Sequence, residues 1–89
     1  MKAIFQTSQF KKDFKRIKKR SKDLSKLKEV VNAIANSEVL EERHHDHALS
    51  GNRSGSRDCR IEPDLILIYR VDGEFLFLER TGSHSDLFR

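Results

Sequence analysis

The dipeptide Asp72-Gly73 is the feature that most constrains the fold. It separates two segments, 65–71 and 74–80, in which apolar side chains dominate or alternate with polar ones. A two-residue connection of this type predicts a β-hairpin with a type I′ turn, because that turn needs positive φ at both central positions. Leu65-Ile66-Leu67-Ile68 is apolar on both faces of an extended chain, which is typical of a central strand.

Shorter strands are expected before this hairpin. His47–Leu49 and Arg57–Glu62 both alternate with a period of two residues. Pro63 has no backbone N–H for a strand ladder, so it should separate the strand ending at Glu62 from the next one. Lys2–Gln6, which contains Ile4 and Phe5, is expected to be a short first strand.

Two helices are expected between the first strand and the others. Their apolar residues recur every three or four positions, and each set forms one stripe. Candidate N-caps are Thr7 or Ser8 for the first helix and Ser21 or Asp23 for the second, which should end near Asn36-Ser37. The stripes are Phe10, Phe14 and Ile17 in the helix over Ser8–Arg20, and Leu24, Leu27, Val31 and Ile34 in the next.

These elements predict a single α+β domain over residues 1–89, in the order β-α-α-β-β-β-β. A short connection makes the helices an antiparallel hairpin, and each helix has one apolar face to bury. We therefore expect the hairpin to pack on one face of an antiparallel sheet.

Charge is unevenly distributed along the chain. Residues 1–30 carry a net charge of +8 and residues 31–89 a net charge of −4. The basic residues Lys11, Lys12, Lys15, Lys18 and Lys19 fall opposite the apolar stripe of the first helix. Such a face either attracts a polyanion, such as RNA, DNA or an acidic protein, or simply faces solvent.

Composition excludes several classes of protein. No apolar run approaches the roughly 18 residues of a membrane span, and the start of the chain has no long apolar signal-peptide region. Cys59 is the single cysteine, so no internal disulfide can form. A reduced, cytoplasmic protein without a membrane partner is expected.

The cluster His44-His45-Asp46-His47 raises the question of a metal site. Zinc sites usually combine two separated pairs of ligands, and here there is one cluster and no second thiol. We expect no metal or other cofactor, and we expect His44 and His45 to be exposed loop residues.

His47 and His84 suit a different chemistry. Antiparallel pairing can bring them to one sheet edge, and two histidines with carboxylates and cations can cleave RNA through its own 2′-OH. In 57–62, alternation places Asp58, Arg60 and Glu62 on one face, which favours a cleft there, and leaves Cys59 for the core.

Two residues near the end of the chain have open roles. Arg80 can hold phosphate or pair with a nearby carboxylate. Phe88 can anchor the tail in the core or stack on a base, and its position alone favours anchoring.

Three motifs resemble the YafQ-type mRNA interferase toxins of the RelE/ParE toxin superfamily. They are His45-Asp46-His47-Ala48-Leu49-Ser50-Gly51, the segment 57–69 with Glu62-Pro63-Asp64 before an Ile/Leu/Tyr strand, and Glu79-Arg80-Thr81-Gly82-Ser83-His84 with Asp86-Leu87-Phe88 after it. Their combination is specific, and the resemblance runs through most of the chain.

The resemblance implies an endoribonuclease that cleaves mRNA on the ribosome and is held inactive by a small antitoxin with an acidic segment. It implies catalytic roles for His47, Asp58, Asp64 and His84. It also places Arg80 near the phosphate and shifts the interpretation of Phe88 toward stacking on the substrate.

Arg60 departs from the family pattern, which often has a second histidine two residues after the first Asp. Arginine cannot shuttle a proton at neutral pH, although it can stabilise a phosphorane. Two alternatives therefore stay open: a toxin of the same fold that binds another target, such as gyrase, without cutting RNA, and a weak ribonuclease acting mainly in a repressor complex with its antitoxin.

Overall fold

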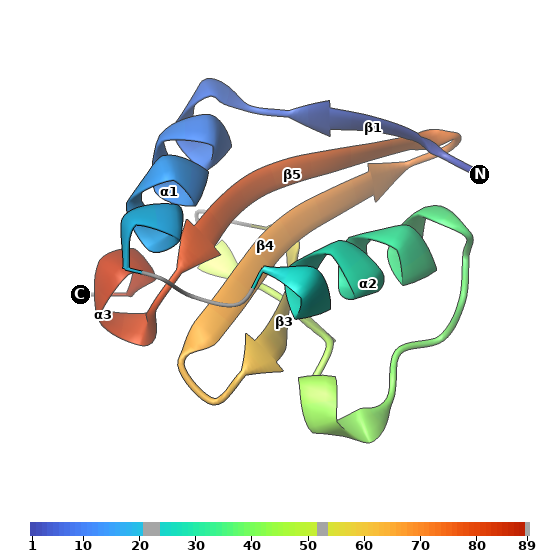
Figure 1. Ribbon diagram of the computed structural model, residues 1–89. Coiled ribbons are helices and arrows are strands. Elements are labelled where there is room, and N and C mark those ends of the chain that lie inside the picture. The colour runs from blue at the N-terminus through green and yellow to red at the C-terminus, as the bar shows by residue number, and fades with distance from the viewer. Residues whose placement is uncertain (21–23, 52–53, 89) are drawn as a thin grey trace.

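A computed structural model describes residues 1–20, 24–51 and 54–88 of the chain (Figure 1). Within these residues the elements follow the expected order, with two short additions, η1 and α3. They are β1 (Ala3–Gln6), α1 (Ser8–Lys19), α2 (Ser25–Ala35), η1 (Glu42–His44), β2 (His47–Ala48), β3 (Arg57–Glu62), β4 (Leu65–Asp72), β5 (Phe75–Gly82) and α3 (His84–Leu87).

The strands form a five-stranded sheet in the order β1-β5-β4-β3-β2. The expected hairpin is confirmed, since β4 and β5 pair antiparallel. The expected type I′ turn centred on Asp72-Gly73 was wrong: Asp72 pairs with Phe75, so Gly73 and Glu74 form the turn, and of these two only Gly73 has positive φ, at +58°. Glycine at the first central position is typical of a type II′ turn, which also matches the twist of the two strands. The central position of β4 is also confirmed, and Leu65 to Tyr69 are all buried. The sheet is nevertheless mixed, because β1 pairs parallel with β5. Pairing between the two ends of a chain leaves no local sequence signal, so this arrangement was not expected.

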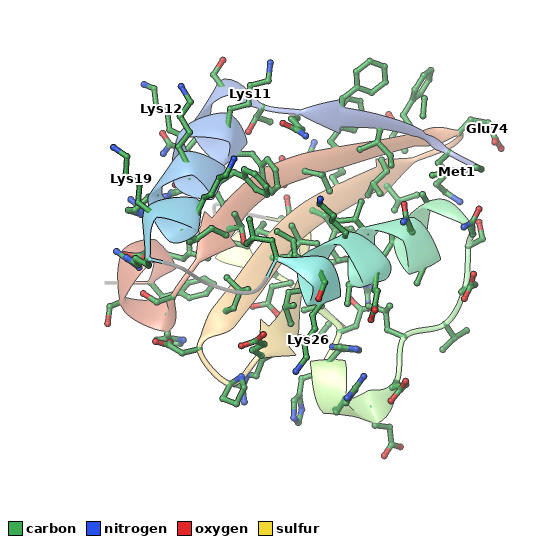
Figure 2. All side chains as sticks on the ribbon, in the orientation of Figure 1. Met1, Lys11, Lys12, Lys19, Lys26 and Glu74 are labelled. Carbon is green, nitrogen blue, oxygen red and sulfur yellow. The ribbon has the colours of Figure 1, made fainter. Side chains whose placement is uncertain are left out.

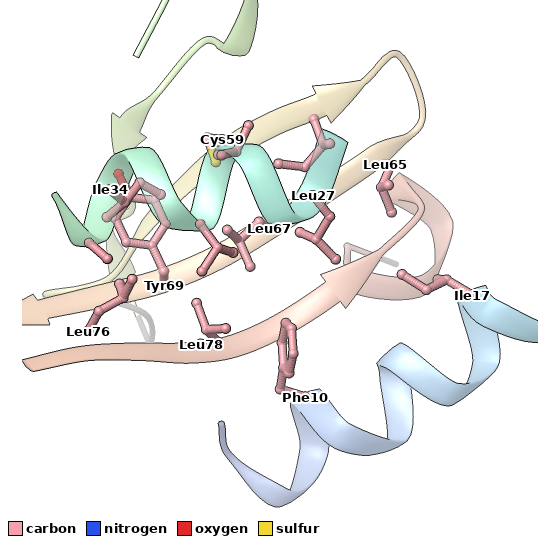
Figure 3. Close-up of a cluster of buried hydrophobic side chains, with 14 residues drawn as sticks. Phe10, Ile17, Leu27, Ile34, Cys59, Leu65, Leu67, Tyr69, Leu76 and Leu78 are labelled. Carbon is pink, nitrogen blue, oxygen red and sulfur yellow. The ribbon is translucent and has the colours of Figure 1, made fainter. Parts of the chain in front are cut away.

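Both long helices lie on one face of the sheet (Figures 1 and 3). Their axes are steeply inclined to each other in Figure 1, rather than antiparallel as expected for a helical hairpin. Their apolar stripes meet Cys59, Leu67, Tyr69 and Leu78 in one buried cluster. Burial of apolar side chains on both sides of this interface is the main source of stability for so small a domain.

The start of α1 is capped as expected, since Thr7 Oγ1 accepts a hydrogen bond of 3.0 Å from the backbone N–H of Phe10. The caps expected for α2, Ser21 and Asp23, lie outside the described residues. In the described parts of the chain, no helix has the length and apolar character needed to cross a membrane.

Candidate active site

The sheet face away from α1 and α2 carries a cavity of about 290 Å³. Residues from β2, β3, β4 and α3, together with flanking loops, surround it, so segments far apart in the sequence meet there. The lining residues are His45, His47, Leu49, Asp58, Cys59, Arg60, Ile66, His84 and Phe88. Of the seven candidate site residues, the cavity therefore contains His47, Asp58, Arg60, His84 and Phe88.

His47 and Asp58 meet because β2 pairs with β3 in the register that sets them opposite each other. His47 Nε2 lies 3.0 Å from Asp58 Oδ1, and His47 Nδ1 lies 2.6 Å from the backbone oxygen of His45. A carbonyl oxygen only accepts, so Nδ1–H donates to it and orients the ring. His47 Nε2 therefore faces the Asp58 carboxylate at a distance at which the two groups can share a proton.

Burial gives Asp58 an unusual affinity for protons. Its side chain is 12% exposed. Desolvation raises the pKa of this carboxyl above its ordinary value, and Asp46 adds to the rise, while the cationic forms of His47, Arg60 and His84 oppose it. A carboxyl of this kind is suited to sharing a proton with the imidazole beside it.

His84 is the first residue of α3, a single helical turn that the sequence analysis did not predict. Ser83 and Asp86 form a capping box at its start: Ser83 Oγ accepts from Asp86 N at 3.1 Å, and Asp86 Oδ2 accepts from Ser83 N at 2.9 Å. A Ser followed three residues later by Asp is a known helix-start signal, and it was available in the sequence.

Asp64 and Phe88 both contact His84. Asp64 lies outside the cavity, in the β3–β4 turn, and its Oδ1 accepts the His84 backbone N–H at 3.1 Å. The Phe88 and His84 rings are 5.2 Å apart between centroids and tilted by 46°. Phe88 is only half-buried, and it lies at the cavity rather than in the hydrophobic core.

Arg60 is exposed at the edge of the cavity, with its backbone oxygen bound to His44. The expectation that His44 is an exposed loop residue was wrong: it is 7% exposed, and its Nδ1 donates to Arg60 O at 2.6 Å. The η1 turn packs against β3 and turns this ring inward, which the irregular local sequence did not reveal. His45 is exposed, as expected.

Arg80 lies away from the cavity and is bound to a buried carboxylate. Its Nε donates to Asp13 Oδ2 at 2.7 Å, and its Nη2 donates to Asp13 Oδ1 at 3.2 Å. Pairing with a nearby carboxylate was one of the two expected roles of Arg80, but the partner Asp13 was not expected. That residue is fully buried between α1 and the end of β5, where the Thr81 backbone N–H also donates to it at 3.2 Å.

The remaining candidates for metal binding point in different directions. Asp46 accepts from Tyr69 Oη at 2.7 Å and from Arg57 Nε at 3.1 Å, and it is not among the residues that line the cavity. Over residues 1–20, 24–51 and 54–88, no three His, Cys, Asp or Glu side chains are grouped so that they could hold a metal ion. Cys59 is 1% exposed in the core, as expected, and burial raises the pKa of its thiol to about 12.

Comparison with known proteins bears on these observations. Residues 2–89 match the family described as "Bacterial toxin of type II toxin-antitoxin system, YafQ". The chain belongs to the YafQ family. A curated relative, "mRNA interferase toxin YafQ" from Escherichia coli K12, is 42% identical over 83 residues, which is 92% of this chain and 90% of the relative.

Solved structures of bacterial toxins have the same fold as this YafQ-family chain. A copper-bound mutant toxin from Helicobacter pylori superposes with a TM-score of 0.94 at 39% identity, covering 99% of this chain and all of that one. A chain of the E. coli DinJ–YafQ complex superposes with a TM-score of 0.91 at 41% identity, covering all of this chain and all of the matched one. The expected family and fold class are thereby confirmed.

Proposed function

We propose that this YafQ-family toxin is a ribosome-dependent endoribonuclease that cleaves mRNA through the 2′-OH next to the scissile phosphate. The observation that carries the proposal is the meeting of His47 and His84 in one cavity, with Asp58 beside the first and Phe88 beside the second. A protein that only binds a target has no need for this pairing. The curated E. coli relative named an mRNA interferase supports the same activity.

The two histidines can divide the proton transfers. His84 takes the proton of the 2′-OH, whose oxygen attacks phosphorus as the bond to the 5′-oxygen breaks. A proton shared between His47 Nε2 and Asp58 is given to the leaving 5′-oxygen. The products are then a 2′,3′-cyclic phosphate and a free 5′-OH, so atoms and charges balance without a cofactor.

Arg60, rather than Arg80, is suited to stabilise the charge that grows on the phosphorane. Arg60 is exposed at the cavity, whereas Arg80 would have to leave its two hydrogen bonds to Asp13 to reach a phosphate. A positioned cation in such a site stabilises the transition state without moving a proton. Phe88 would stack on a base, and Asp64 would hold the backbone of His84.

The test is cleavage of a defined mRNA by the purified toxin, with and without translating ribosomes, in the presence of a chelator. His47→Ala and His84→Ala should each lower the rate by about 100-fold or more, the usual contribution of a general acid or base. Full cleavage by His84→Ala would break the scheme. Loss of cleavage in chelator would instead point to a metal, as in the copper-bound H. pylori relative.

An antitoxin partner is proposed for the basic face of α1. Lys11, Lys12, Lys15, Lys18 and Lys19 are all exposed, and Figure 2 shows Lys11, Lys12 and Lys19 pointing away from the sheet. The E. coli relative has been solved in complex with DinJ, which supports a protein partner for this chain. An acidic antitoxin segment on this face would bind more weakly as salt rises. Affinity that is insensitive to salt would place the antitoxin elsewhere.

A further inference from the structure

The single turn of α3 needs support from the rest of the fold. Isolated helical turns are unstable in water, because the ordering entropy of nucleation exceeds the gain from one hydrogen bond. Yet α3 carries His84 and Phe88 at the cavity. Whatever holds this turn in place also fixes the position of both rings.

The support comes from the C-terminal end of α1. Arg20 reaches across to Asp86 with two contacts, Nη1 to Oδ2 at 2.9 Å and Nη2 to Oδ1 at 3.4 Å. Arg16 Nη2 lies 3.8 Å from the same carboxylate and 3.1 Å from Asp13 Oδ1. Asp86 therefore joins the capping box of α3 to a line of charges that ends at the buried Asp13–Arg80 pair.

The backbone of β5 is shaped to admit this carboxylate. Gly82 has φ +153°, which side chains with a Cβ rarely adopt. A Cβ added there would lie 3.0 Å from Asp86 Oδ2, 3.1 Å from Asp86 Cβ and 3.4 Å from Arg16 Nη2. Close approach of Asp86 to the end of β5 thus depends on a glycine at position 82.

We propose that Asp86, held by Arg20 and Arg16, is a positioning residue that fixes His84 and Phe88 for the cleavage reaction. The proposal rests on the function given above for His84. It assigns Arg16 and Arg20 a role apart from the lysines of α1, because both arginines turn toward α3 and bind a carboxylate there. Asp86 touches neither the cavity nor the proposed reacting atoms.

The test combines kinetics with NMR of the His84 ring. Asp86→Ala and Arg20→Ala should lower kcat roughly 10- to 100-fold, the scale expected for a displacement of about 1 Å in a catalytic group, and leave KM for programmed ribosomes nearly unchanged. Asp86→Asn should fall in between, because its amide oxygen can still cap α3 but does not pair with arginine. Glu29→Ala, which removes an exposed carboxylate from α2, is the control and should match the native toxin.

The NMR measurement tests the positioning itself. The tilted Phe88 ring, 5.2 Å away, gives the His84 ring protons a ring-current shift, which Asp86→Ala and Arg20→Ala should reduce while leaving the His47 resonances in place. An unchanged His84 signal, or a rise in KM without a fall in kcat, would overturn the proposal. A changed signal with full activity in both Asp86→Ala and His84→Ala would retain the positioning contact and refute the catalytic role of His84 instead.

Discussion

Replacement of Asp13 by Asn is the sharpest test of how this small fold is held together. Asp13 is fully buried and accepts hydrogen bonds from Arg80, Arg16, Gln9 and the Thr81 backbone. Asn keeps one oxygen acceptor but loses the charge, which leaves the Arg80 guanidinium without a charged partner. Breaking a fully buried ion pair costs about 3–5 kcal/mol.

The expected magnitude is somewhat smaller here, because the Arg80 side chain stays 20% exposed and water can reach part of it. We expect Asp13→Asn to lower the free energy of unfolding by about 2–3 kcal/mol. For a domain of this size, that corresponds to a fall in Tm of roughly 8–24 °C. The chain has no tryptophan, so thermal and urea unfolding at pH 7 are best followed by far-ultraviolet circular dichroism.

A double-mutant cycle with Arg80→Met separates the pair from the rest of the site. The two substitutions should be coupled by about 1–3 kcal/mol, and Glu29→Gln at an exposed position should change stability by less than about 0.5 kcal/mol. If Asp13→Asn unfolds like the native toxin, or if the two effects simply add, the buried pair does not stabilise the fold. Loss of cleavage in Arg80→Met at unchanged stability would return Arg80 to phosphate binding.

Three further predictions concern the pH dependence of stability, Gly82 and Cys59. Burial alone would raise the pKa of Asp13, but hydrogen bonds from Arg80, Gln9 and Thr81 together outweigh it and hold this pKa below its ordinary value. The pKa of Asp86 is also lowered, by hydrogen bonds from Arg20 and Ser83. The stabilising contribution of these two carboxylates is complete above the ordinary Asp pKa of about 4 and is lost as pH falls through the lowered values. The urea concentration at the unfolding midpoint should therefore decrease as pH is lowered below 4, and it should decrease less steeply in Asp13→Asn. Gly82→Ala should impair cleavage by displacing Asp86, while antitoxin binding persists; normal cleavage would show that the end of β5 tolerates a Cβ. Cys59 should react with a thiol reagent only as fast as the protein unfolds, and rapid reaction in native buffer would contradict its burial.

The sequence alone determined the parts of this protein that depend on local chemistry. Apolar periodicity identified both helices and the positions of the strands along the chain, and Asp72-Gly73 located the β4–β5 hairpin, because turns and stripes are encoded by neighbouring residues. Charge and residue type indicated His47, Asp58 and His84 as candidate catalytic residues, and the resemblance to YafQ toxins implied mRNA cleavage as their reaction.

Only the tertiary structure decided which of these residues meet. The register of β2 with β3 places His47 against Asp58, and the packing of α1 on β5 turns Arg80 away from the cavity and onto Asp13. His44 is buried for the same kind of reason, since η1 packs on a strand that lies later in the chain. Parallel pairing of β1 with β5 likewise joins the two ends of the molecule. Contacts between distant segments depend on how whole helices and strands pack, so a local pattern of residues does not predict them.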